Sequence, residues 1–229
     1  MNSLLYLSIL PSIILLFYIY KEDNVEKEPF GLLVRCFVGG LFSGFIILLF
    51  NSIGFSYEFD VNNNFSVFIY SFIFVGFIEE FMKLFMGYFI TYKDKEFNYL
   101  YDSIVYMSFV SLGFLLLESI LYIILTSDIL VSIIRGITTL PAHIFFSIFM
   151  GYYLGMAKKE RILKNKSLEN KYLCYSLIIP SILHGFFDYC LYTSSNLGIV
   201  FFCLFVGILY IVSFKKIKEV SGIEKSLYE

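Results

Sequence analysis

The sequence predicts an all-α membrane protein: a polytopic bundle of about seven transmembrane helices, with its N-terminus outside and its C-terminus in the cytoplasm. Three observations lead to this fold class. First, 59% of the 229 residues are hydrophobic and only 16% are charged, against about 25% charged residues in soluble domains. Second, the apolar residues form seven long runs, most of them close to the roughly 20 residues that cross a bilayer. Third, Lys and Arg are concentrated in alternate connecting segments, as the positive-inside rule requires.

The seven predicted spans follow one another with short polar connections. In order they cover residues 3–20, 30–50, 65–91, 102–126, 129–157, 172–192 and 197–214. The first has neither the preceding basic residues nor the small-x-small cleavage site of a secretory signal peptide, so we expect it to stay as a membrane anchor. The third and fifth are longer than a bilayer requires, which predicts that they tilt or begin at the interface.

The connecting segments alternate in basic charge without exception. The segments after the first, third, fifth and seventh spans carry Lys or Arg, whereas those after the second, fourth and sixth carry none. We expect residues 1–229 to form a single integral membrane domain, with a motif-bearing core at 65–192 and a short cytoplasmic tail at 215–229. The net charge of −2 gives no reason to expect a nucleic-acid partner, and the expected environment is the lipid bilayer.

Ionisable side chains inside the predicted spans are the clearest sign of a functional site. A charge at the centre of a membrane helix costs roughly 2.5–3.5 kcal/mol on insertion scales, so such residues are usually kept for function. Apart from Arg35 near a span end, they are Glu79, Glu80, Lys83, Glu118, Arg135, His143, His184 and Asp188. Counted from the outer span ends at 1.5 Å per residue, the acids and histidines fall between the midplane and the outer face. We expect them to line one cavity that opens toward the outside.

The depths of the two histidines differ in this count. His143 lies about 9 Å deeper than His184 and Glu118, a gap that helix tilt or a kink at Pro141 would close. The acids also outnumber the cations within the spans by two formal charges. A divalent cation would compensate this excess, and so would protonation of some carboxyls.

Several of these residues also have a structural interpretation. Glu118 and Arg135 would pair to hold the fourth and fifth spans together, and Lys83 would serve as a counter-ion for the acid pair that precedes it. Asp188 lies four residues after His184, so it would be a solvated interfacial residue or a partner that orients the imidazole. Intramembrane histidines also serve as hydrogen-bonding packing residues.

Four short motifs occur in order on consecutive predicted spans. They are EExxK at 79–83, FxxxE at 114–118, Leu-Pro-Ala-His at 140–143 and HGxxD at 184–188. Together they resemble the PrsW family of bacterial intramembrane proteases, which is similar to a wider group that contains CAAX prenyl proteases and bacteriocin-immunity membrane proteins. The second motif ends in Glu118, where the prenyl protease branch has His, and this favours the PrsW branch.

The resemblance implies a peptidase of the bacterial cell membrane that cuts a single-pass membrane protein near its external face. The family's best-known task is site-1 cleavage of an anti-sigma factor, which starts regulated intramembrane proteolysis in an envelope-stress response. The expected catalytic residues are Glu79, Glu80, His143 and His184, with Glu79 as the general base.

The sequence leaves two mechanisms open. In a zinc enzyme His143 and His184 would be ligands, with Glu118 or Glu80 as the third and one position left for water. In a metal-free enzyme the same histidines would help Glu79 orient the water and stabilise the oxyanion.

Two other classes of protein carry similar residues. Intramembrane acids and histidines also build proton- or ion-coupled transporters, although no pair of matching broken spans suggests an inverted repeat. A non-catalytic, immunity-like membrane scaffold would keep the fold without the chemistry. A scaffold should tolerate Glu79→Gln, whereas a protease should not.

Overall fold

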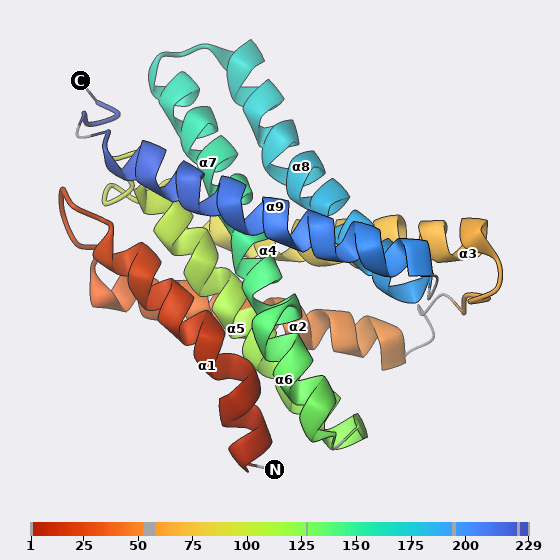
Figure 1. Ribbon diagram of the computed structural model, residues 1–229. Helices are drawn as coiled ribbons and strands as arrows, with labels where there is room; N and C mark the ends of the chain where they lie inside the picture. Colours follow the sequence, from red (N-terminus) through yellow and green to blue (C-terminus); the bar gives the residue numbers. More distant parts are fainter. Residues whose placement is uncertain (1, 53–57, 127, 194–195, 224, 229) are drawn as a thin grey trace.

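The computed structural model describes the whole chain except residues 1, 53–57, 127, 194–195, 224 and 229. The described residues form helices and no strands (Figure 1). The helices are α1 (Asn2–Lys21), α2 (Phe30–Ser52), α3 (Asn64–Ile69), η1 (Tyr70–Phe77), α4 (Ile78–Thr91), α5 (Asp102–Thr126), α6 (Ile129–Ile137), α7 (Thr139–Ile162), α8 (Lys166–Tyr192) and α9 (Asn196–Ser221).

The helices have the length and composition of membrane spans. Within the described residues, six helical stretches are long and apolar enough to cross a membrane, and α1 adds the shorter apolar stretch Ile9–Lys21. The predicted all-α membrane bundle is therefore confirmed, with six to seven spans. The orientation of the termini stays a prediction.

The third span is one continuous helix made of α3, η1 and α4. Asn63 caps its start, because the side-chain oxygen accepts hydrogen bonds from the backbone N–H groups of Phe65 and Ser66. Its middle part, η1, is a π-helix of eight residues. Such turns are rare, usually single, and frequent at functional sites. The α-helical part that follows carries Glu79 and Glu80 in its first turn.

The fifth span differs from the single segment predicted over 129–157. It consists of α6 and α7, separated at Thr138, whose φ of −120° and ψ of −71° are not helical. Pro141 lies in the first turn of α7, where a residue without an N–H group is tolerated. The chain therefore breaks before Pro141 instead of kinking at it, and His143 lies near the start of α7.

Helix α5 is at the centre of the bundle and packs against α1, α2, α4 and α7. Its contact with α2 is a direct backbone contact. A Cβ atom on Gly40 would lie 1.9 Å from the carbonyl oxygen of Val110, and one on Gly113 would lie 2.0 Å from that of Phe37. Small residues at such crossings let membrane helices approach closely.

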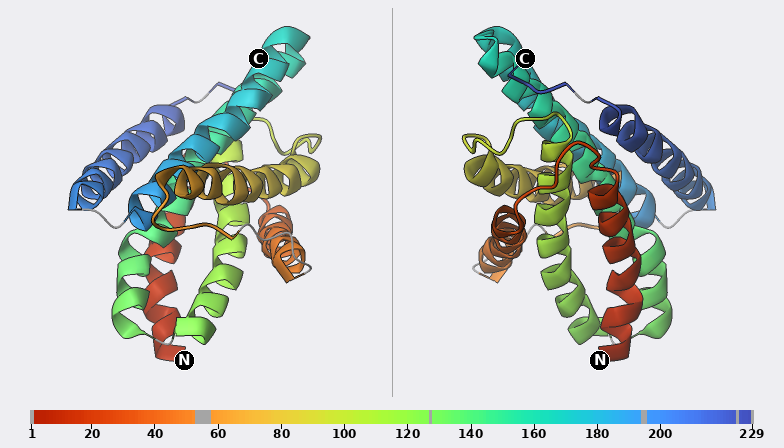
Figure 2. Two further views of the ribbon diagram at one scale, coloured as in Figure 1. Left: turned by 90° about the vertical axis from the view of Figure 1, so that its right-hand side faces the viewer. Right: turned by 90° about the vertical axis from the view of Figure 1, so that its left-hand side faces the viewer.

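Helix α9 lies at the edge of the molecule, against α7 and α8 (Figure 2). It continues to Ser221, beyond the predicted span end at 214, and its residues Ile217 and Val220 are buried. Farther on, the backbone N–H of Leu227 donates to the carbonyl of Asn98 at 2.7 Å. The segment predicted as a tail thus contains the last turns of α9 and a contact with the loop that precedes α5.

Candidate active site

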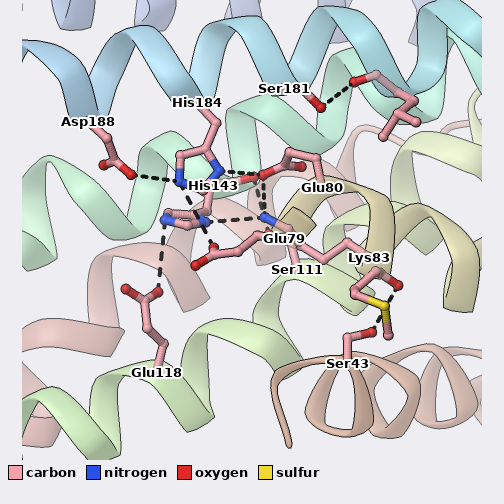
Figure 3. A network of polar contacts seen from close by, with 12 residues as sticks. Ser43, Glu79, Glu80, Lys83, Ser111, Glu118, His143, Ser181, His184 and Asp188 are labelled. Atoms are coloured by element: carbon pink, nitrogen blue, oxygen red, sulfur yellow. Dashed lines mark hydrogen bonds and ion pairs between the residues drawn. The ribbon is translucent and has the colours of Figure 1, made fainter. Parts of the chain in front are cut away.

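Helix α4 divides its two glutamates between the protein interior and a cavity (Figure 3). Glu80 and Lys83 are fully buried and form an ion pair of 2.5 Å between Oε1 and Nζ. Each stabilises the burial of the other, since an unpaired charge at such a place costs several kcal/mol. The Glu79 side chain is 16% exposed and lines the cavity.

His184 on α8 lies between the two glutamates. Its Nδ1 is 2.8 Å from Oε1 of Glu80. Glu80 is paired with a cation and therefore accepts, so Nδ1 carries the proton and donates it to this carboxylate. The other nitrogen, Nε2, lies 4.0 Å from Oε2 of Glu79 and 3.5 Å from Oδ2 of Asp188. A carboxylate on one imidazole nitrogen is the usual outer partner of a metal-binding histidine.

His143 on α7 lies beside His184, with the ring centroids 4.5 Å apart. Its Nδ1 is 3.2 Å from Nζ of Lys83, and its Nε2 is 3.8 Å from Oε2 of Glu118. The depth gap of about 9 Å expected from counting residues along straight spans is absent. The break before α7 and the close packing of α7 on α8 bring the two histidines together.

Arg135 of α6 forms a second ion pair at the cavity. Its Nη2 lies 2.6 Å from Oε1 of Glu118, and its guanidinium carbon lies 3.9 Å from the centroid of the Tyr122 ring. The ion pair and the cation–π contact together link α5 to α6. Oε2 of Glu118 has no hydrogen-bond partner among the described residues.

Three of these side chains are placed to hold a metal ion. Glu79, His143 and His184 each offer one ligand atom, and these atoms all lie within 4.8 Å of one another. Two histidines and a carboxylate form a ligand set of zinc hydrolases. Glu80 and Glu118, the acids considered as third ligand, are instead engaged with Lys83 and Arg135.

The charge balance points to the same place. The two ion pairs neutralise Glu80 and Glu118, which leaves Glu79 and Asp188 without a Lys or Arg partner within the described part of the chain. Both remaining carboxylates lie within 4.0 Å of Nε2 of His184. A cation between them would compensate their charge in a medium that solvates ions poorly.

These groups line a cavity of about 630 Å³, a size typical of ligand sites. Its polar wall carries Glu79, His143, His184 and Asp188. Besides Glu118 and Arg135, helices α5 and α6 give the cavity an apolar wall of aliphatic residues, which includes Leu117, Leu121, Leu125, Val131 and Ile134. The cavity therefore combines apolar surface with a cluster of ionisable groups, which suits an uncharged peptide segment.

The structure brings together all eight site residues named from the sequence. Six line the cavity, and the other two, Glu80 and Lys83, lie behind them against the histidines. Sequence reasoning missed the tyrosines of the cavity wall, Tyr70, Tyr122 and Tyr192, and the π-helix before the acid pair. The tyrosines give no signal in a chain so rich in aromatic residues.

Comparison with known proteins shows the family of this chain. A family model described as "PrsW family intramembrane metalloprotease" matches residues 28–214. The chain is 35% identical to Protease PrsW of Oceanobacillus iheyensis, over 96% of each chain. It is 33% identical to Protease PrsW of Clostridioides difficile, over 99% of this chain and 94% of that one. It is also 33% identical to Protease PrsW of Bacillus subtilis, over 97% and 98%.

No solved structure matches the chain significantly. The resemblance found in the four motifs is confirmed by these relatives, which are bacterial, and by a match that extends well outside the motifs. The predicted metal cofactor is supported by the family description and by the Glu-His-His group. The chain is a multi-pass bacterial membrane protein, and it belongs to the PrsW family of intramembrane metalloproteases.

Proposed function

We propose that this protease hydrolyses a peptide bond of a single-pass membrane protein near the external face of the membrane. One observation carries the proposal: ligand atoms of Glu79, His143 and His184 converge from three helices on the polar wall of a cavity. Such expensive groups are kept in a membrane protein for chemistry or transport. The apolar residues that line the same cavity suit a peptide better than an ion path.

The proposed metal is zinc, held by Glu79, His143 and His184. The donor set fits, because it combines neutral imidazoles with the carboxylate of Glu79. Glu79 and the neighbouring Asp188 are the two site acids without a Lys or Arg partner among the described residues. When bound, Zn²⁺ acts as a Lewis acid that polarises the peptide carbonyl and makes water more acidic.

The side chains of the site divide the remaining tasks. Glu79 has two carboxylate oxygens, of which one would hold the metal and the other accepts the proton of the attacking water. Its Oε2 has no hydrogen-bond partner among the described residues. Glu80 holds His184 in the tautomer whose Nε2 faces the cavity, and Lys83 keeps Glu80 ionised. Asp188 lies beside the same Nε2 and adds negative charge next to the place proposed for the metal. Glu79, once protonated by the water, gives that proton to the leaving amine.

The proposed substrate class is an anti-sigma factor, cut at site 1 in regulated intramembrane proteolysis. This part rests on the family resemblance, since the names of the relatives state only that they are proteases. The apolar wall formed by α5 and α6 favours a cleaved segment with aliphatic side chains.

The external position of the cut depends on the topology. Reporter fusions after Asn63 and Asp128 should be active outside the cell, and one after Lys164 should be active inside. Of these three segments, the one around Lys164 is rich in basic residues and the other two have none. The reverse pattern would place the cut at the cytoplasmic face.

Co-expression tests the activity itself. Candidate single-pass membrane proteins from the same genome are expressed with the native chain, with Glu79→Gln or with Glu219→Gln, and their cleavage is followed by immunoblot. Glu219 is a matched control, since its side chain is 54% exposed and lies outside the cavity. We expect cleavage with the native chain and the control only. Equal cleavage by Glu79→Gln at equal expression would overturn the proposal and favour a scaffold or a transporter.

A further inference from the structure

We propose that the crossing of Gly76 in η1 with Gly185 in α8 positions the catalytic groups, and that the π-helix exists to bring Gly76 to this crossing. The inference rests on the proposed function, because it concerns the geometry of the same site. Gly76 and Gly185 are positioning residues in this account, and they touch neither substrate nor metal.

The backbones of the two helices are in contact at this point. A Cβ atom on Gly76 would lie 2.8 Å from the backbone nitrogen of Gly185 and 2.8 Å from the carbonyl oxygen of Ser181. A Cβ atom on Gly185 would lie 2.6 Å from Cδ1 and 2.8 Å from Cα of Phe72. Ordinary contacts of a Cβ atom begin at 3.4 Å, so a methyl group at either position pushes the helices apart.

Both glycines of the crossing lie close in sequence to residues of the site. Gly185 directly follows His184, and Gly76 precedes Glu79 and Glu80 by three and four residues. The contact between Nδ1 of His184 and Oε1 of Glu80 is 2.8 Å long. A separation of about 0.6 Å, the amount that an alanine at 76 requires, would lengthen it beyond the range of a good hydrogen bond.

The pattern of buried residues explains the π-helix. Along this span the buried positions facing the bundle include Val67, Ser71, Gly76, Glu80 and Leu84. Three of the steps are of four residues, but the step from Ser71 to Gly76 is of five and lies within η1. In an α-helix, positions five apart point about 140° away from each other. The wider π-helical turn, with i→i+5 hydrogen bonds, keeps them on one face.

The consequence is that α3, η1 and α4 all contact α8. If the whole span were an α-helix, its two ends could not both face α8. Either the residues up to Ser71 or the acid pair Glu79 and Glu80 would turn away from His184. Aromatic side chains also connect the two helices here, because Phe72 packs against Phe68 and Tyr189, at centroid distances of 4.6 and 6.4 Å.

The test compares two glycine-to-alanine variants in membrane helices. Gly76→Ala introduces the clash, whereas Gly207→Ala in α9 is the matched control, since a Cβ atom there meets nothing within 4 Å. Both changes raise helix propensity equally. The purified proteins are measured for zinc affinity by chelator competition. We expect at least a tenfold lower affinity for Gly76→Ala and a change of less than twofold for the control.

A second measurement needs no metal. The chain has two histidines, so modification by diethyl pyrocarbonate can be followed separately at His143 and His184 by mass spectrometry. We expect Gly76→Ala to speed the modification of His184 several-fold in metal-free protein. The two proposals can fail separately. If the native protein neither binds zinc nor cleaves but His184 reacts faster in Gly76→Ala, the proposed function is wrong and the positioning role is supported. Native-like zinc affinity and native-like reactivity of His184 in Gly76→Ala would overturn the positioning role.

A second variant covers the case in which Gly76→Ala does not fold. Gly185→Ala introduces a clash at the same crossing from the α8 side, with both the ring and the Cα atom of Phe72. It should lower the zinc affinity and speed the modification of His184 as Gly76→Ala does, again with Gly207→Ala as the control. Native zinc affinity and native reactivity of His184 in Gly185→Ala would contradict the proposal.

Discussion

Two regions of the molecule bury carboxylates, and they do so in different ways. The cavity cluster, Glu79, Glu80, Glu118 and Asp188, is interleaved with two histidines and two cations around an open volume. The loop cluster is formed by Glu28, in the connection between α1 and α2, and by Asp102 and Tyr106 of α5. Glu28 is 3% and Asp102 0% exposed, so this cluster is buried at least as deeply.

The loop cluster is held by hydrogen bonds without metal-ligand geometry. Oδ2 of Asp102 accepts from the backbone N–H groups of Asn98 and Tyr99 at 2.8 and 2.7 Å, and the Tyr106 hydroxyl donates to Glu28. Burial and the neighbouring Asp102 also raise the pKa of Glu28, so a proton on this carboxyl compensates its burial. Buried acid alone does not mark a site; convergence of acid with histidine at a cavity does.

The largest expected difference between the two clusters is in activity. Glu79→Gln removes the proton acceptor and should reduce cleavage by at least about 10³-fold, as should His184→Ala. Glu28→Gln should leave the cleavage rate within about twofold, because Gln reproduces the protonated acid. Rates are measured on a cleavable substrate with purified proteins. A comparable loss in Glu28→Gln would show that the two regions are not functionally separate.

Metal content should separate the clusters next. We expect about one zinc per native chain by elemental analysis, since the cavity holds one set of three ligands. A double variant, His143→Ala with His184→Ala, should contain none. Glu28→Gln should retain the metal. A chelator should abolish cleavage and added Zn²⁺ should restore it. Full activity in metal-free protein would instead select the carboxylate mechanism, with Glu79 as base and no Lewis acid.

The sequence predicted the members of the cavity cluster better than their arrangement. The cost of charge in lipid singled out the residues, and their order on consecutive spans indicated the family. Depth counting failed for His143, because it assumed a straight span where the chain breaks at Thr138. It also could not predict η1, since the sequence does not show which helix a span packs against, here α8 at Gly185. Local propensity carries no information on such tertiary contacts.

A smaller effect is expected for the ion pair at the edge of the cavity. Arg135→Lys keeps the charge near Glu118 but loses the planar contact with the Tyr122 ring. Cleavage should fall about tenfold, far less than for Glu79→Gln, with zinc content unchanged. Arg135→Met, which also removes the charge, serves as the second variant and should lose more. Loss of zinc in Arg135→Lys would mean that Glu118 supports the metal ligands more directly than the distances indicate.

The smallest expected effect is on stability, and it lies in the loop cluster. Burial, with Asp102 beside it, raises the pKa of Glu28 from 4.5 to about 9. The folded protein therefore binds this proton more tightly than the unfolded chain does, and its stability falls as pH rises from about 4.5 to about 9. Glu28→Gln, which mimics the protonated acid, should be more stable than the native chain at pH 8 by at least about 1 kcal/mol. Near pH 4.5 the two should be equally stable. Thermal unfolding in detergent, followed from pH 5 to 8.5, measures the difference. A constant gap between the two proteins across this range would show that Glu28 does not exchange its proton on unfolding.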